Sequence, residues 1–166
     1  MTRRLIRAVL ETSFWTAAHR ADVAANCFDL FEIVVPRAVE REILRPEAAP
    51  REFPYSTLFR QFRERFRDPP PDAPPPLRMF GPGEAEAIPL ALHLSADLLM
   101  NEHRAARFAE ARGVWVVTAP MVIAMLYRLG VISWRAADRK LDLVKPITSP
   151  AILERGRRLL AELQAD

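Results

Sequence analysis

The chain has 166 residues, a length typical of one domain, and half of its residues are hydrophobic, which is enough for a substantial core. A formal net charge of +3 is a mild basic excess, which permits nucleic-acid binding but does not argue for it. The single Cys27 excludes an internal disulfide and a cysteine-based zinc site. No window approaches the roughly 18 apolar residues of a membrane span. Glu11 interrupts the first apolar run, so we expect no signal peptide and a cytoplasmic location.

The N-terminal half alternates short apolar strands with helical segments. Val9 and Leu10 end a buried strand that leads into Glu11, and Thr12 and Ser13 supply side chains that begin helices. Further along we expect a helix over 16–31, a strand over 32–36 that ends at Pro36, a helix over 37–44 stopped by the prolines at 46 and 50, and an amphipathic helix over 55–66 with a phenylalanine stripe facing the core.

The C-terminal half begins with a proline-rich, semi-extended loop at about 68–77. The pieces on either side are too small to fold separately, so we expect one domain over 1–166. Beyond the loop we expect helices over 83–94, 103–113, 120–130, 133–145 and 149–163, with strands over 96–100 and 114–118. Strands separated by helical crossovers predict an α/β fold with a central parallel sheet covered on both faces.

Four glutamates lie where such a sheet places its active site, at the carboxyl ends of the strands. Glu11 follows the first strand, Glu102 follows the strand over 96–100, Glu84 opens a helix, and Glu42 lies on the helix after the second strand. We expect them to converge on one cleft. Carboxylate oxygens are the hard ligands that Mg²⁺ and Mn²⁺ prefer, and such ions activate water in phosphodiester hydrolysis.

Each acid also has a purely structural interpretation. Glu84 and Glu102 lie in first helical turns, where the helix dipole favours a negative charge by about 0.3–1 kcal/mol, and Asn101 is a candidate N-cap. Glu42 fits among the solvated charges of its helix. Glu11 is the hardest to explain in this way, because an acid directly after a buried strand needs a partner. Taken together, the four positions favour a cluster.

The order of these segments resembles PIN-domain proteins, in the branch related to VapC-type toxin nucleases. The similar stretches are "VLETS", "VPRAVEREI", "GEAEAI", "ADLLMNEHRAARFAEARGVWVV", "LGVIS" and "SPAILERG". The resemblance implies a three-layer α/β/α, Rossmann-like domain with a central, mostly parallel sheet. It also implies a metal-dependent endoribonuclease that uses Mg²⁺ or Mn²⁺ to hydrolyse RNA, acts as the toxin of a toxin–antitoxin pair, binds a cognate antitoxin and forms a homodimer.

Carried over by position, the resemblance assigns the family's acids to this chain. Its four catalytic acids fall on Glu11, Glu42, Glu84 and Glu102, its metal ligands on Glu11, Glu84 or Glu86, and Glu102, and its supporting polar side chains on Ser13 (or Thr12) and Asn101. Arg104 and Arg107 are candidate contacts for RNA phosphates, with an ion pair to Glu110 as the alternative.

The first and fourth acids are glutamates, whereas the family pattern has aspartates there. The additional methylene matters because octahedral Mg²⁺ tolerates misplaced ligands poorly, and small misplacements cost roughly 10²-fold in rate. The alternative function is therefore a catalytically degenerate PIN-like domain that binds RNA or protein. A dinucleotide-binding Rossmann domain is disfavoured, because no glycine-rich phosphate motif follows the first strand.

The remaining large side chains have simpler interpretations. We expect Trp15, Trp115 and Trp134 to be core or interface anchors, and Cys27 to be a small buried apolar residue. The arginines between residues 60 and 67 are either the solvated back of the amphipathic helix or an RNA-facing rim.

Overall fold

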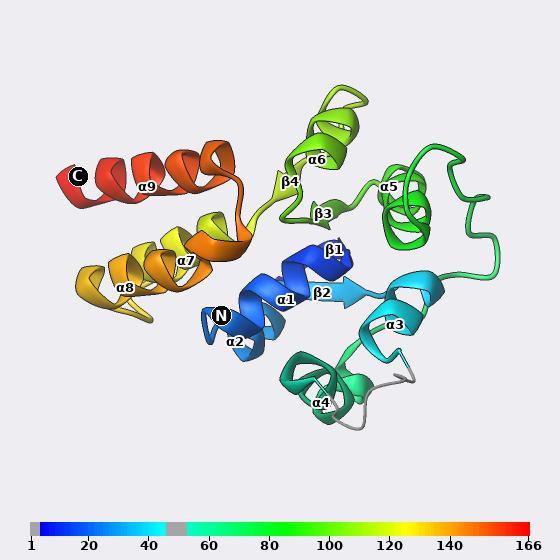
Figure 1. The fold of residues 1–166 in the computed structure, drawn as a ribbon, viewed down its shortest axis with the longest axis horizontal. Helices are drawn as coiled ribbons and strands as arrows, with labels where there is room; N and C mark the ends of the chain where they lie inside the picture. The colour runs from blue at the N-terminus through cyan, green and yellow to red at the C-terminus, as the bar shows by residue number, and fades with distance from the viewer. Residues whose placement is uncertain (1–3, 46–52) are drawn as a thin grey trace.

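A computed structural model describes residues 4–45 and 53–166 of the chain (Figure 1). Within these ranges the sheet has four strands, β1 Ile6–Leu10, β2 Phe31–Val34, β3 Asp97–Leu99 and β4 Val116–Val117. Their spatial order is β2-β1-β3-β4, and every neighbouring pair is parallel. The expected parallel sheet is therefore confirmed. Between one strand and the next, a helical connection carries the chain back to the end of the sheet where the strands begin.

Helices connect and cover the strands. In chain order they are α1 Thr12–Arg20, α2 Ala24–Leu30, α3 Arg37–Ile43, α4 Pro54–Gln61, α5 Pro82–Leu94, α6 His103–Glu110, α7 Ala119–Arg128, α8 Trp134–Val144 and α9 Pro150–Ala165, with short 3₁₀ turns at Arg63–Arg65 and Lys145–Ile147. In Figure 1 the long helices α7, α8 and α9 gather at one end of the molecule, and α5 lies near the other.

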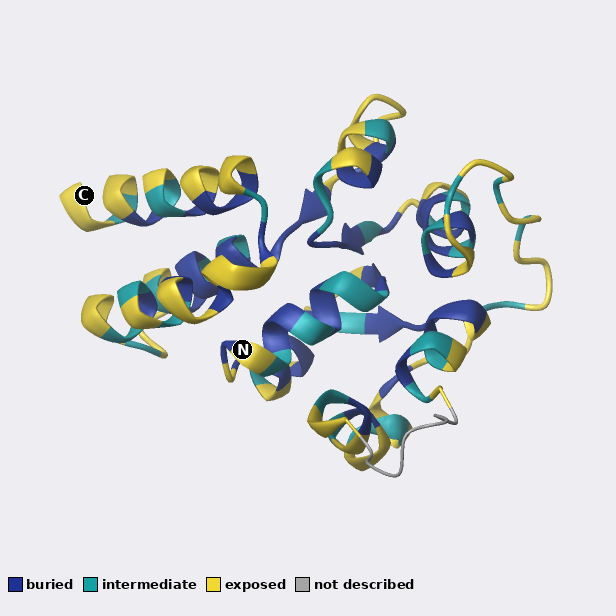
Figure 2. Cartoon of the chain, viewed as in Figure 1, coloured by how far each residue is buried: buried dark blue, intermediate teal, exposed yellow. Residues whose placement is uncertain are grey.

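Alternating side chains of the strands divide the core into two halves. Ala8 and Leu10 of β1 belong to a large apolar cluster that includes buried residues of α1, α2, α4, α7, α8 and α9. Val9, between them, belongs to a second cluster built with α5 and α6. Successive residues of a strand point to opposite faces, so the sheet is covered on both sides. Figure 2 shows this burial, with most of the sheet dark blue and the outer faces of the helices yellow. The expected three-layer α/β/α fold is confirmed.

The single helix expected over 16–31 is wrong. Helix α1 ends at Arg20, Asp22 adopts a left-handed backbone with φ of 54°, and α2 begins only at Ala24. The turn is held from α8, where the Lys140 ammonium donates to the carbonyl of Ala21 at 2.8 Å and to that of Asp22 at 3.1 Å. Phe31, expected in the helix, is the first residue of β2.

The helix expected over 55–66 ends early. Helix α4 stops at Gln61, and a 3₁₀ turn brings Arg67 beside β2. There the Arg67 N–H donates to Ile33 O at 2.8 Å and Val35 N–H donates to Arg67 O at 3.0 Å, so the chain leaves the helix to pair with the edge strand. The core-facing phenylalanine stripe is confirmed, since Phe59 and Phe66 are buried. The prolines at 46 and 50 lie outside the described residues.

Only one tryptophan is a core anchor. Trp15 is buried, its ring meets the edges of Phe28, Phe59 and Phe66, and its indole N–H donates to the Tyr55 carbonyl at 2.8 Å. The prediction of a core position is wrong for Trp115 and Trp134, two residues that are 66% and 38% exposed. Cys27 is buried as expected, and burial raises the pKa of its thiol to about 12.

Pro89 explains how the proline-rich loop is attached. It lies inside α5 without ending the helix, and its ring nitrogen has no proton to donate to Ala85 O one turn earlier. That carbonyl instead accepts the N–H of Leu77, at 2.9 Å, from the end of the loop. Asp72 in the loop forms an ion pair with His93 of α5 at 3.2 Å. The loop over 68–77 therefore follows α5 along a defined path.

Replacing Gly156 with alanine should lower the free energy of unfolding by about 1–3 kcal/mol, as overpacking typically does. A Cβ at this buried position of α9 would overlap the Cβ of Pro120 and lie 3.3 Å from its Cα, and the proline ring at the start of α7 is rigid. Urea unfolding of the two proteins measures the change. A variant more stable than the wild type, as helix propensity alone favours, would contradict this close packing.

Candidate active site

Glu11 is the acid at the carboxyl end of the central strand β1. Its N–H extends the sheet by donating to Leu99 O at 3.0 Å, and the residue is only 4% exposed. Its Oε2 accepts the N–H of Ser13 at 2.9 Å and the Ser13 hydroxyl, which makes Glu11 the N-cap of α1. Thr12 and Ser13 lie in the first turn of α1, as expected at a helix start, but the side chain that caps the helix belongs to the acid before them.

Glu102 performs the same local role at the end of β3. Its two carboxylate oxygens accept the N–H groups of Arg104 at 3.0 Å and Ala105 at 2.6 Å, so it is the N-cap of α6. The assignment of Asn101 as that N-cap is therefore wrong. A glutamate side chain is long enough to reach both backbone donors from the cap position, which accounts for its place here.

Ser13 and Asn101 connect the strand ends beneath these acids. The Ser13 hydroxyl, besides donating to Glu11, accepts the N–H of Asn101 at 2.9 Å. The buried Asn101 amide donates to the Thr148 hydroxyl at 3.0 Å and accepts the Ala119 N–H at 3.3 Å. All polar atoms of the Asn101 side chain thus face the protein, so Asn101 supports β3 against α7 and the segment before α9.

Glu42 reaches the same region from α3. The Thr12 hydroxyl donates to its Oε2, and the N–H of Gly83 donates to its Oε1 at 2.8 Å. One carboxylate therefore connects α1, α3 and the start of α5. This function of Thr12 and Gly83 was not predicted from the sequence, where the glycine just before Glu84 was its only signal.

Glu84 and Glu86 point in different directions from the first turns of α5. The Glu86 carboxylate accepts the N–H of Ala38 at 2.9 Å and lies 3.7 Å from the Arg41 guanidinium, so it is engaged with α3. Glu84 is half-buried and feels the negative charges of Glu42 and Glu102. We therefore favour Glu84 over Glu86 as the third acid of the cluster.

Charge interactions centred on Glu11 and Glu84 connect the four acids. Burial first, and then the charges of Glu84 and Glu42, raise the pKa of Glu11 to about 7, against an opposing effect of the hydrogen bonds from Ser13. Burial, and then the charges of Glu102 and Glu42, raise the pKa of Glu84. Repulsion among carboxylates from β1, α3, α5 and β3 is a cost that a bound cation would remove.

The donor set fits a hard divalent cation. The facing groups are carboxylates, without sulfur or imidazole, as Mg²⁺ and Mn²⁺ prefer. Over residues 4–45 and 53–166 no three His, Cys, Asp or Glu side chains are already arranged around one point. Mg²⁺ commonly needs only one or two carboxylates together with water and substrate phosphate, so an incomplete protein cage is compatible with binding.

Arg104 and Arg107 lie on α6, the helix that Glu102 caps. The positive charge of Arg104 lowers the pKa of Glu84, opposing the effect of the neighbouring carboxylates. Glu110, the alternative ion-pair partner, instead binds Arg155 at 3.3 Å. Within the described ranges neither Arg104 nor Arg107 forms an ion pair.

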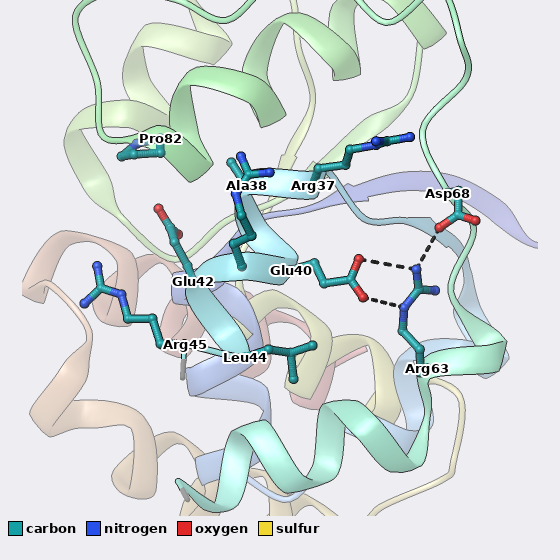
Figure 3. Close-up of a pocket in the computed structure, with 10 residues that line it drawn as sticks. Arg37, Ala38, Glu40, Glu42, Leu44, Arg45, Arg63, Asp68 and Pro82 are labelled. Atoms are coloured by element: carbon teal, nitrogen blue, oxygen red, sulfur yellow. Dashed lines mark hydrogen bonds and ion pairs between the residues drawn. The ribbon is translucent and has the colours of Figure 1, made fainter. Parts of the chain in front are cut away.

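A groove of about 800 Å³ opens beside the acids along α3 (Figure 3). Glu42 and Pro82 lie where the groove meets the acids, and Arg37, Arg41 and Arg45 line its length. Arg63 lies on the opposite side and is bound to Glu40 at 2.6 Å and to Asp68 at 2.7 Å. The groove therefore joins a positively charged wall to the acid cluster.

The comparison with known families agrees with this architecture. A family profile described as a PIN domain matches residues 9–147, most of the chain, and the chain belongs to the PIN-domain family. The family gives it a nuclease-type fold. No curated protein matches the sequence significantly. Among the described helices none is both long and apolar enough to cross a membrane.

Proposed function

We propose that the protein is a metal-dependent endoribonuclease that hydrolyses RNA phosphodiester bonds with Mg²⁺ or Mn²⁺. The observation that carries the proposal is a set of four carboxylates, two that follow β1 and β3 and two on α3 and α5, whose negative charges raise the pKa values of Glu11 and Glu84. In a PIN-domain protein such a cluster is best explained as a cation site, because structure alone gives no benefit from placing these charges together.

Each acid has a defined role in this proposal. Glu11, Glu84 and Glu102 would hold the cation, and Glu42, positioned by Thr12 and Gly83, would complete the cluster. When bound, the ion supplies charge neutralisation and lowers the pKa of a water molecule. Glu11, with a pKa of about 7, would hold a proton on its carboxyl group near neutral pH and release it when a cation enters. Ser13 would orient the Glu11 carboxylate throughout.

The alternative is a degenerate site that binds RNA or protein without cleavage. It is favoured by the backbone hydrogen bonds that both Glu11 and Glu102 accept as helix caps, since capping alone explains a carboxylate at these two positions. Helix capping does not explain the burial of Glu11 or the approach of Glu42 and Glu84. The ribonuclease therefore remains our first proposal.

The proposed biological setting is that of a VapC-like toxin, a single domain over 1–166 that acts in the cytoplasm and pairs with a cognate antitoxin. A homodimer is part of the proposal. Its support is the exposure of two large apolar side chains, Trp115 and Trp134, which are costly to leave in water and suit a protein interface.

The test combines metal binding with RNA cleavage. We expect calorimetry to detect Mn²⁺ binding to the wild-type chain, and labelled RNA to be cleaved with Mn²⁺ or Mg²⁺ but not with chelator. A folded Glu11→Gln, Glu102→Gln double variant should lose both activities, because two of the proposed ligands become neutral amides. An exposed Glu162→Gln variant is the control. If the wild-type chain binds no Mn²⁺, the degenerate site becomes the better explanation.

A further inference from the structure

The arginines of the α3 groove form a stripe. Arg37 and Arg41 lie one helical turn apart on the same side of α3, about 6 Å from each other along the axis, and Arg45 follows two residues after the helix ends at Ile43. All three arginines line the groove. We propose that this stripe binds the phosphate backbone of a single-stranded RNA segment and leads it past Glu42 into the acid cluster. The inference rests on the proposed ribonuclease function and identifies the form in which the substrate is held.

The charge on this wall is available to a ligand. Arg37 and Arg45 are exposed and, in the described part of the chain, form no hydrogen bond or ion pair. The Arg41 side chain is 70% exposed, and its single partner, Glu86, is 3.7 Å away, a distance at which a surface pair contributes little. Guanidinium groups suit phosphate because their planar donors bind two oxygens at once.

Arg63, across the groove, shows what a structural arginine looks like in this protein. Its guanidinium meets both Glu40 and Asp68, as the dashed lines in Figure 3 show, and these carboxylates raise its pKa. Over the described residues the α3 stripe has no comparable set of bonded partners: Arg37 acts on Asp68 only through its charge, and Arg41 forms only the long ion pair with Glu86. Its charges are therefore better explained by an external anion than by the stability of the fold.

The position of the groove favours a single strand. Glu42 follows Arg41 near the end of α3, and its carboxylate is held at the start of α5 by the Gly83 N–H. Figure 3 shows Arg45 beside Glu42 and Arg37 toward the other end of the groove. A chain of phosphates bound along the stripe would thus pass directly beside the cluster, where a single strand can bring its backbone within reach of the acids.

The experiment measures RNA binding separately from cleavage. A fluorescent oligouridylate is titrated with the full chain in EDTA, where no cation supports hydrolysis, by anisotropy at several salt concentrations. The test variant is Arg37→Ala, Arg45→Ala. The control is Arg135→Ala, Arg139→Ala, which removes two exposed arginines from α8 and changes the net charge identically.

We expect the test variant to bind about 25-fold more weakly at 0.1 M salt, with the slope of log K against log salt smaller by about 1.4, because each lost phosphate contact removes about 0.7. The control should bind like the wild type. Equal affinities for all three proteins would overturn the inference. So would a wild-type chain that binds no RNA, including one that binds an acidic protein instead. Neither result affects the metal-binding test of the nuclease function. The RNA-binding stripe and the nuclease function can therefore be disproved independently.

Discussion

Without divalent ions, the free energy of unfolding of the wild-type chain should fall by about 3 kcal/mol between pH 4.5 and pH 8 because of Glu11 alone. Its pKa rises from an ordinary 4.5 to about 7 on folding, and linkage converts that rise into this free energy. Glu11 is buried, so little solvent screening reduces the effect. Urea unfolding in chelator at a series of pH values measures it.

The direction of the change follows from proton counting. Between pH 4.5 and pH 7 the folded chain retains a proton on Glu11 that the unfolded chain has released, so raising the pH favours unfolding. Below pH 4.5 both states hold the proton, and above pH 7 both have lost it. The pKa of Glu84 is raised as well, so its contribution has the same sign.

Glu11→Gln should remove most of this pH dependence, whereas Glu162→Gln on the exposed side of α9 should retain it. A variant with the full wild-type slope would show that Glu11 is not the titrating group. Adding Mn²⁺ at pH 8 to 100 times its Kd should return about 2.7 kcal/mol to the wild type and nothing to Glu11→Gln, because only the folded site binds the ion.

The alternation of strands and helices, the parallel sheet and the position of Glu11 and Glu102 after strands were all predictable from the sequence. These features depend on local patterns, such as the apolar run of β1 and the acid that directly follows it. The rule that active sites form at the carboxyl ends of parallel strands then places both acids at one edge.

The features that sequence reasoning missed depend on partners far along the chain. The break at Asp22 is held by Lys140, more than a hundred residues away. The Asn101 side chain is engaged by Thr148 and Ala119, and no local pattern predicts that contact. From the sequence, a glutamate in place of aspartate at residue 102 was considered only for its effect on metal geometry. The structure shows a second consequence, because the longer side chain of Glu102 also caps α6.

Gly83→Ala should weaken Mn²⁺ binding and slow RNA cleavage by about 100-fold while leaving the fold intact. A Cβ at residue 83 would overlap the Glu42 Oε2 and lie 2.9 Å from its Cδ. The Glu42 carboxylate must then leave the N–H of Gly83 and the hydroxyl of Thr12. A shift of about 1 Å in a catalytic group costs roughly 10²-fold in rate.

Gly81→Ala is the matched control, because it lies two residues earlier at the same helix start and a Cβ there would meet nothing within 4 Å. Urea unfolding should change little for either variant, since the Gly83 clash involves the far end of a flexible side chain rather than backbone. Calorimetry and a cleavage time course then separate the two glycines. If Gly83→Ala binds Mn²⁺ and cleaves RNA as well as Gly81→Ala, the position of the Glu42 carboxylate does not matter, and the site reduces to Glu11, Glu84 and Glu102.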